Sequence, residues 1–239
     1  MVDLGPFRLF LLEKTCCQPL QKDRMGRHPF KRRAPTRSIG RKVIIVCEGK
    51  RTETGYFNAI RVSMRIPTLQ VQVLHSGGTD PLTIVRAALE QKETKRRDKA
   101  WTKGDSAWAV FDGDEHRDEN PANWNDAIQL AASRDINLAI SNPCFELWYL
   151  LHYHNQLAQL TRVEAQRVLR QYLPTYQKAH VLWPEPLKVL TADAIARARR
   201  LEERRTADDL AVHCNPSTGV SELIEFLLAL EQERGESSS

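Results

Sequence analysis

Two stretches of this sequence are apolar at nearly every position and then end at acidic residues. Residues 42–49 read KVIIVCEG, and residues 106–116 read SAWAVFDGDEH. Strands that are apolar on both faces are typical of a parallel sheet covered by helices on each side. The pattern therefore predicts an α/β fold, with Glu48, Asp112 and Asp114 at the points where strands end.

Helical and strand patterns alternate along the middle of the chain. After the first strand we expect a helix at 52–66 with Thr52 as N-cap, a strand at 68–75, a helix from Asp80 and Pro81 to about residue 99, the strand at 106–116, a helix at 123–134, a strand at 136–141 and a buried helix beginning near Pro143. The order β-α-β-α-β-α-β predicts a mostly parallel four-stranded sheet with right-handed crossovers.

The chain divides into three parts by composition. Residues 1–38 are rich in basic residues and lack periodicity, which predicts a poorly ordered basic arm, either solvated or gripping phosphates. Residues 39–155 contain the α/β pattern. Residues 156–239 predict a helical extension packed on that core, with helices at 161–173, 191–205 and 221–233, the first starting in a capping box of Thr161 and Glu164.

Composition limits the classes of protein to which the chain can belong. The 35 basic and 30 acidic residues give a net charge of +5, a mild bias that suits a polyanionic partner without proving one. The five cysteines are irregularly spaced and include no Cys-x-x-Cys pair, which argues against a zinc site or a disulfide scaffold. There is no signal-peptide pattern and no membrane-spanning stretch, so we expect a cytoplasmic protein that does not enter membranes.

The acidic residues at the strand ends predict a metal site. The carboxyl ends of parallel strands emerge at one edge of a sheet, so Glu48 and the Asp112/Asp114 pair can converge there. Two such charges about 4 Å apart repel by about 4 kcal/mol at an effective dielectric of about 20. A set of hard oxygen ligands without Cys or His favours Mg²⁺ or Mn²⁺, the metals used to cleave phosphodiesters. The alternative is a solvated acidic loop.

Three ordered motifs carry a resemblance to a known family. They are CEGKRTETGYF at 47–57, VFDGDEH at 110–116 and SNPCFELWYLLH at 141–152, and NPSTGVSELIEFLL at 215–228 is similar to the family's C-terminal segment. Together they resemble the RloB family, also called the AbiLii type, over residues 41–228. That family resembles Toprim proteins, the fold of primases, topoisomerases and OLD-type nucleases, which implies a Toprim/Rossmann-like core here.

The resemblance also implies an activity and a biological context. It assigns Glu48 to the first acid, a general acid/base or metal ligand, and Asp112 and Asp114 to the metal-binding pair. The position between the aspartates is often Arg in the family; here it is Gly113, which leaves the pair intact but removes a possible phosphate contact. The implied protein is a nuclease in prokaryotic anti-phage defence that works beside an AAA-type ATPase partner.

Several further residues at the same edge are candidates, each with a simpler alternative. Lys50 and Arg51 can contact a phosphate or be solvated, and the Gly49-Lys50-Arg51-Thr52 sequence lacks the upstream glycine of a P-loop, since position 44 is Ile. Glu115 and Glu53 are possible metal or outer-sphere ligands, although Glu53 also suits the first turn of a helix. Residues that can bind substrate or support the site are His116, Asn142 and Glu146, although a helix start alone explains Asn142.

Three functions compete on this pattern. The first is a metal-dependent nuclease acting on DNA or RNA. The second is a phosphatase of the haloacid-dehalogenase kind, but that chemistry needs its Asp-x-Asp on the first strand, whereas Asp112 and Asp114 follow the third. The third is a non-catalytic sensor or binding subunit of a defence complex, which would keep the sheet and dispense with the acids.

Overall fold

The computed structural model describes residues 40–68, 70–113, 116–177 and 187–236. Residues 38–239 form one compact unit, and the predicted basic arm at 1–38 lies outside the described residues. Asp114, Glu115 and Trp183 lie outside them as well. None of the described helices is both long enough and apolar enough to cross a membrane.

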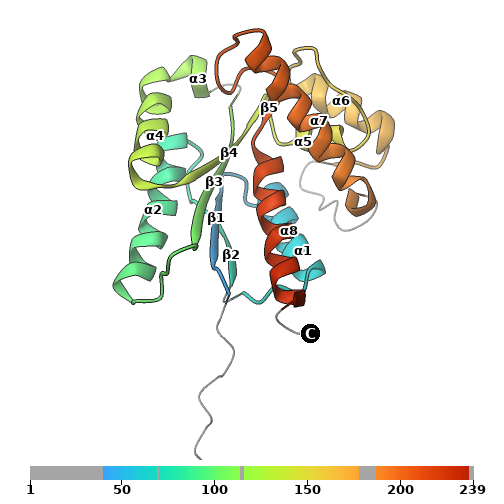
Figure 1. Ribbon diagram of the computed structural model, residues 1–239. Helices are drawn as coiled ribbons and strands as arrows, with labels where there is room; N and C mark the ends of the chain where they lie inside the picture. The colour runs from blue at the N-terminus through green and yellow to red at the C-terminus, as the bar shows by residue number, and fades with distance from the viewer. Residues whose placement is uncertain (1–39, 69, 114–115, 178–186, 237–239) are drawn as a thin grey trace, which may run out of the picture. The chain divides into compact units, whose positions relative to one another are not determined.

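A five-stranded sheet in the order β2-β1-β3-β4-β5 forms the centre of this unit (Figure 1). The first four strands run parallel to one another, and β5 joins β4 in the antiparallel direction. Their bounds are β1 Val43–Cys47, β2 Val71–His75, β3 Ser106–Asp112, β4 Asn137–Asn142 and β5 Ser217–Thr218. All five residues of β1 are buried, as its continuous apolar run predicted.

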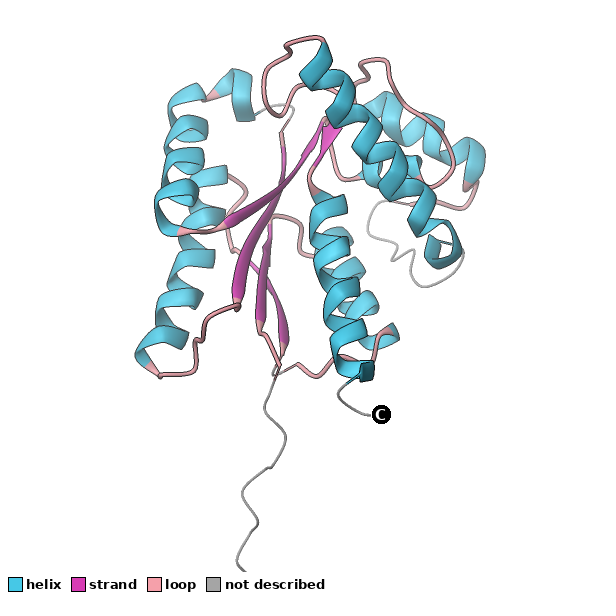
Figure 2. Cartoon of the chain, viewed as in Figure 1, coloured by secondary structure: helices cyan, strands magenta, loops and turns pink. Residues whose placement is uncertain are grey.

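Helices cover both faces of the sheet (Figure 2). Helices α2 (Pro81–Arg97) and α4 (Pro121–Arg134) pack together on one face, over a core that includes Ile44, Val85 and Phe111. The other face has the larger core, to which five helices contribute: α1 (Thr52–Ser63), α5 (Glu146–Leu151), α6 (Arg162–Tyr172), α7 (Leu187–Ala207) and α8 (Val220–Glu236). The four-residue α3 (His116–Glu119) precedes α4.

Two of the predicted helix N-caps are confirmed and one is wrong. The Asp80 side chain accepts a hydrogen bond from the Thr83 backbone N–H, and Thr161 and Glu164 form the predicted capping box. The prediction that Thr52 caps α1 was wrong, because Arg51 holds the N-cap position and makes no side-chain cap bond. Thr52 is already the first residue of the helix.

The predicted α/β fold with its alternating order and mostly parallel sheet is confirmed, but the sheet has one strand more than the four expected. Residues 156–239 were expected to be entirely helical, yet Ser217–Thr218 pairs with Ser141 and Asn142. A two-residue strand has no periodicity that a sequence could reveal. Tertiary contacts hold it: the Ser141 and Thr218 hydroxyls are 2.9 Å apart, and the Gly219 N–H donates to the Ile140 carbonyl.

Candidate active site

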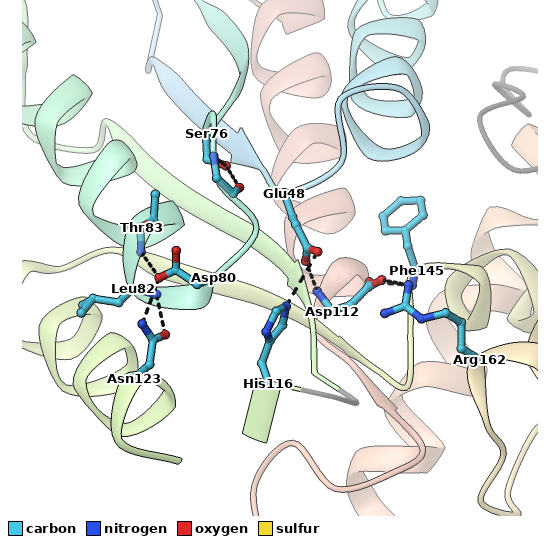
Figure 3. A network of polar contacts seen from close by, with 11 residues as sticks. Glu48, Ser76, Asp80, Leu82, Thr83, Asp112, His116, Asn123, Phe145 and Arg162 are labelled. Carbon is cyan, nitrogen blue, oxygen red and sulfur yellow. Dashed lines mark hydrogen bonds and ion pairs between the residues drawn. The ribbon is translucent and has the colours of Figure 1, made fainter. Parts of the chain in front are cut away.

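Glu48 and Asp112 come from neighbouring strands and meet at the carboxyl edge of the sheet. Glu48 directly follows β1, and its backbone N–H donates to the Val110 carbonyl of β3 at 2.9 Å. Asp112 is the last residue of β3. The Glu48 Oε2 atom accepts a hydrogen bond of 3.0 Å from the Asp112 backbone N–H (Figure 3). Residues 64 positions apart are therefore joined directly, as the parallel topology predicted.

The Asp112 carboxylate is buried and its two oxygens have different partners. Oδ1 accepts from the Phe145 backbone N–H at 2.9 Å, just before α5. Oδ2 accepts from Nη1 of Arg162, the first residue of α6, also at 2.9 Å (Figure 3). Asp112 is only 4% exposed, so its contact with Arg162 lies mostly out of water. Charge-assisted bonds of this kind fix the carboxylate and dock both helices on the sheet.

Negative charge is in excess around Asp112. Its pKa is raised well above the usual value, first by burial and then by the charges of Glu53 and Glu48; Arg162 opposes this shift. Glu53 lies in the first turn of α1 and is 7% exposed. A Cβ atom on Gly49 would lie 1.6 Å from Glu53 Oε2, so glycine is needed for this carboxylate to approach the backbone.

Glu146 is a further buried acid near the site, and it has its own partners. Its Oε1 accepts from Gln166 Nε2 and from the Tyr176 hydroxyl, each at 3.0 Å. Glu146 is 2% exposed and its charge adds to the raised pKa of Asp112. Glu146 thereby ties α6 and the segment after α6 to α5, and its supporting role in the site stays a prediction.

The other predicted site residues differ in how closely they approach the carboxylates. His116 Nε2 lies 3.8 Å from Glu48 Oε1 (Figure 3). Lys50 and Arg51 are exposed between β1 and α1, at the same sheet edge. Asn142 ends β4, is 6% exposed, and donates its side-chain N–H to the His213 carbonyl at 2.9 Å. Among the described residues, His116 is the one of these four that pairs with Glu48 or Asp112 through an ion pair or hydrogen bond.

The donor set of the site is made of oxygen atoms, which suits a hard divalent cation. Among the described residues no three His, Cys, Asp or Glu side chains form a group able to hold a metal ion. The predicted ligands Asp114 and Glu115 lie outside those residues. Of the three main predicted ligands, Glu48 and Asp112 are the two that the structure describes, and the charge of Glu48 helps to raise the pKa of the buried Asp112.

Gly113 occupies the position directly after Asp112 and is closely surrounded. A Cβ atom there would lie 3.2 Å from Ile140 Cγ2 and 3.3 Å from Asn142 Cβ. Its backbone N–H donates to the Ser141 carbonyl at 2.9 Å, which extends the pairing of β3 with β4. A larger residue here would push against β4, so glycine fits the packing of this chain.

A model of the RloB-like protein family matches residues 43–227. The chain belongs to the RloB-like family. The match begins at the first residue of β1 and ends within α8, so it contains every described residue of the site. No curated protein and no solved structure matches the chain.

Sequence reasoning missed one residue of the site in this RloB-like chain. Arg162 was treated as part of a helical extension, yet it provides the guanidinium at Asp112. Its position after the Thr161 cap could be predicted, because Thr161 and Glu164 form a capping box. The contact of Arg162 with Asp112 could not be predicted, because the two residues lie 50 positions apart and no local pattern links them.

The cysteines and tryptophans of the described chain have mainly structural positions. Cys47 and Cys144 are buried free thiols, and burial raises the pKa of both. Trp108 and Trp124 are buried in the core, while Trp101 is partly buried. Trp148 is fully buried and donates its indole N–H to the Tyr56 hydroxyl at 2.7 Å.

Proposed function

We propose that this RloB-like chain is a Mg²⁺-dependent (or Mn²⁺-dependent), Toprim-like nuclease that hydrolyses phosphodiester bonds in DNA or RNA. The observation that carries the proposal is the convergence of Glu48 and Asp112 at the carboxyl edge of parallel strands, with the Asp112 N–H bound to Glu48 Oε2 at 3.0 Å. Ligands bind at this edge in open α/β sheets.

Glu48 and Asp112 would hold the metal ion, with Asp114 and Glu115 as further ligands expected from the sequence. The burial of Asp112 beside Glu48 and Glu53 supports this proposal, because one guanidinium faces several carboxylates there. When bound, a divalent ion would neutralise the phosphate and activate a water molecule.

The remaining residues would bind substrate and move protons. His116 lies 3.8 Å from Glu48 Oε1, so it can exchange a proton with that carboxylate or hold a phosphate oxygen. Lys50 and Arg51, exposed beside Glu48, would attract the phosphate backbone. Arg162 would hold Asp112 in position through its 2.9 Å contact with Oδ2.

A second function is favoured by the same Asp112 contacts. Both of its oxygens already accept hydrogen bonds, from Phe145 and Arg162, as a purely structural carboxylate would. A non-catalytic sensor or binding subunit of a defence complex would have this feature. Under either function, the family resemblance suggests anti-phage defence and an AAA-type ATPase partner as the working context.

Nuclease assays on conservative variants would separate the two functions. Wild type, Glu48→Gln and Asp112→Asn would be incubated with Mg²⁺ or Mn²⁺ and either plasmid DNA or total RNA, with and without the ATPase partner. Each amide keeps one acceptor oxygen, so the fold should survive, and thermal unfolding would verify that. We expect metal-dependent cleavage by wild type and a loss of at least about 100-fold in each variant, the size of a lost electrostatic contact to the transition state.

Glu90→Gln is the matched control, because Glu90 is an exposed carboxylate on α2. It should cleave like wild type. Equal cleavage by wild type and folded Glu48→Gln would contradict the nuclease assignment. A wild type that stays inactive with its partner present, yet binds nucleic acid, would favour the binding subunit.

A further inference from the structure

Two adjoining pockets lie beside the carboxylate site. The first is polar, has a volume of about 340 Å³, and is lined by Gly113, Arg117, Asp118, Asn142, Gln159, Cys214 and Asn215. The second has a volume of about 150 Å³. Both are lined by Gln159, Cys214 and Asn215, so they adjoin at these three residues, and we refer to the two together as the groove. Because Gly113 directly follows Asp112, the groove begins next to the proposed reaction centre.

The polar pocket contains side chains able to recognise a nucleotide. Arg117 has no ion-pair partner among the described residues, and the Gln159 amide has no hydrogen bond there either. The Asn215 side chain is fixed, since it donates to the Leu160 carbonyl at 2.7 Å and accepts from the Leu160 N–H at 3.2 Å. The guanidinium and the Gln159 amide are therefore available to a phosphate and to a base or sugar.

The second pocket combines apolar and basic side chains. Leu157 and Leu210 are 39% and 46% exposed, which is high for leucines beside a concave surface. Arg204 and Arg205 of α7 line the same pocket, where each is paired with a nearby acid, Asp208 and Glu202. Exposed apolar side chains next to guanidiniums suit a nucleobase and its neighbouring phosphate.

We propose that this groove binds two consecutive nucleotides of a single strand of nucleic acid, adjacent to the bond that is cut. The proposal rests on the proposed nuclease function and specifies its substrate as unpaired. The larger pocket lies at the small end of the range for ligand sites, so it has room for one unpaired nucleotide but not for a stacked base pair; the smaller pocket has room for part of the next nucleotide. A duplex presents its bases stacked and paired, and they could enter only after being flipped out.

Binding measurements without metal would test the groove independently of catalysis. Full-length wild type, Arg117→Ala and Gln159→Ala would be titrated, in EDTA, with short labelled single-stranded DNA and RNA and with a duplex. Matched controls are Arg86→Ala and Gln171→Ala, exposed residues of α2 and α6. We expect Gln159→Ala to weaken single-strand binding by about fivefold or more, and Arg117→Ala to lower the salt slope by about 1. The two control variants should bind single strands as wild type does, and the affinity for the duplex should be the same in all variants.

Alkylation of Cys214 gives a second readout at the point that both pockets share. Cys214 is partly exposed, whereas Cys47 and Cys144 are buried, and peptide mass spectrometry reports each thiol separately. A saturating single strand should slow Cys214 alkylation several-fold, and a duplex should not. Equal protection by duplex, or no protection at saturation, would overturn the proposal.

The two proposals fail in different ways. If wild type cuts nucleic acid but Arg117→Ala and Gln159→Ala bind single strands like wild type, the groove is refuted and the nuclease remains. If the single strand protects Cys214 and both variants bind it weakly, but no metal supports cleavage, the nuclease is refuted and the groove remains.

Discussion

Asp112 shows how one carboxylate can be both part of the packing and part of a site. Phe145 and Arg162 satisfy its oxygens, while burial and then the charges of Glu53 and Glu48 raise its pKa. The positive charge of Arg162 therefore occupies a place that a metal ion could share or take over. Its side chain is 25% exposed, so water can still reach it.

Replacing Arg162 with methionine should make the chain less stable and more responsive to Mg²⁺. Removing one partner of a buried pair leaves Asp112 uncompensated; because Arg162 is partly exposed, we expect a loss of about 1–3 kcal/mol in unfolding free energy. Millimolar Mg²⁺ should then raise the unfolding temperature of Arg162→Met more than that of wild type, since a bound ion stabilises the folded state.

The control for this measurement is Arg170→Met, which removes an exposed charge from the same helix. It should lower stability by less than about 0.5 kcal/mol and leave the Mg²⁺ response unchanged. An Arg162→Met variant with no greater Mg²⁺ response than wild type would argue against a cation at Asp112.

Because His152 is buried, we expect the protein to lose stability in mild acid. His152 is 1% exposed, Nδ1 contacts the Trp148 carbonyl at 2.9 Å, and Nε2 has no hydrogen-bond partner among the described residues. Burial, with help from Arg197, lowers its pKa from 6.5 to about 4. Above pH 6.5 both folded and unfolded chains hold it neutral. Between pH 6.5 and 4 only the unfolded chain takes up the proton, so stability falls as pH falls.

Urea unfolding of wild type and His152→Gln across this pH range would measure the effect. Each pKa unit corresponds to about 1.4 kcal/mol, so wild type should lose up to about 3 kcal/mol more than the variant between pH 6.5 and pH 4. His154→Gln, at an exposed position, should lose as much as wild type. Parallel curves for wild type and His152→Gln would contradict a buried neutral His152.

At the scale of elements, the starts of α2 and α6 and the parallel strands follow from local patterns, and β5 does not. Asp80 caps α2, and the Thr161 capping box starts α6, as their residue types predicted. Strand β5 is held by β4, and the chain then enters α8 through Gly219. An ideal Cβ on Gly219 would lie 3.1 Å from the Leu138 carbonyl oxygen and 3.3 Å from Ala139 Cα.

Gly219→Ala should therefore separate β5 from β4. Overpacking against backbone atoms that cannot move easily should cost about 1–3 kcal/mol of unfolding free energy, measured by denaturant titration. Gly235→Ala is the matched control in the last turn of α8, where a Cβ meets nothing within 4 Å. It should be neutral or stabilise by up to about 1 kcal/mol, because alanine favours a helix. Equal effects of the two substitutions would contradict the close approach at Gly219.

At the scale of the whole unit, one core joins the α/β region to the C-terminal helices. The larger cluster contains Ile45 of β1, Trp148 of α5 and Leu227 of α8. Helix α8 packs against β4 on the face that α1 also covers, so that face would lose part of its cover without α8 (Figure 1). Residues 38–239 should for this reason unfold in one step.

Leu227→Ala tests this cooperativity. Leu227 is 1% exposed, so its truncation should cost about 2–4 kcal/mol, and circular dichroism and tryptophan fluorescence should report the same lowered midpoint. Gln232→Ala, at an exposed position of α8, should leave the midpoint within experimental error. Two separate transitions, with only one affected by Leu227→Ala, would show that the C-terminal helices fold independently.

The sequence alone determined the α/β class, the succession of the first four strands along the chain and the edge at which Glu48 and Asp112 lie. Those features depend on apolar periodicity and on the rule that parallel strands end at a common edge, both of which are local or topological. The tertiary structure decided the contact of Arg162 with Asp112, the added strand β5 and the two adjoining pockets that Gln159 and Cys214 line. Each of these three features joins segments that lie far apart in the sequence. They depend on complementary shape and charge between those segments, which exists only after the chain has folded.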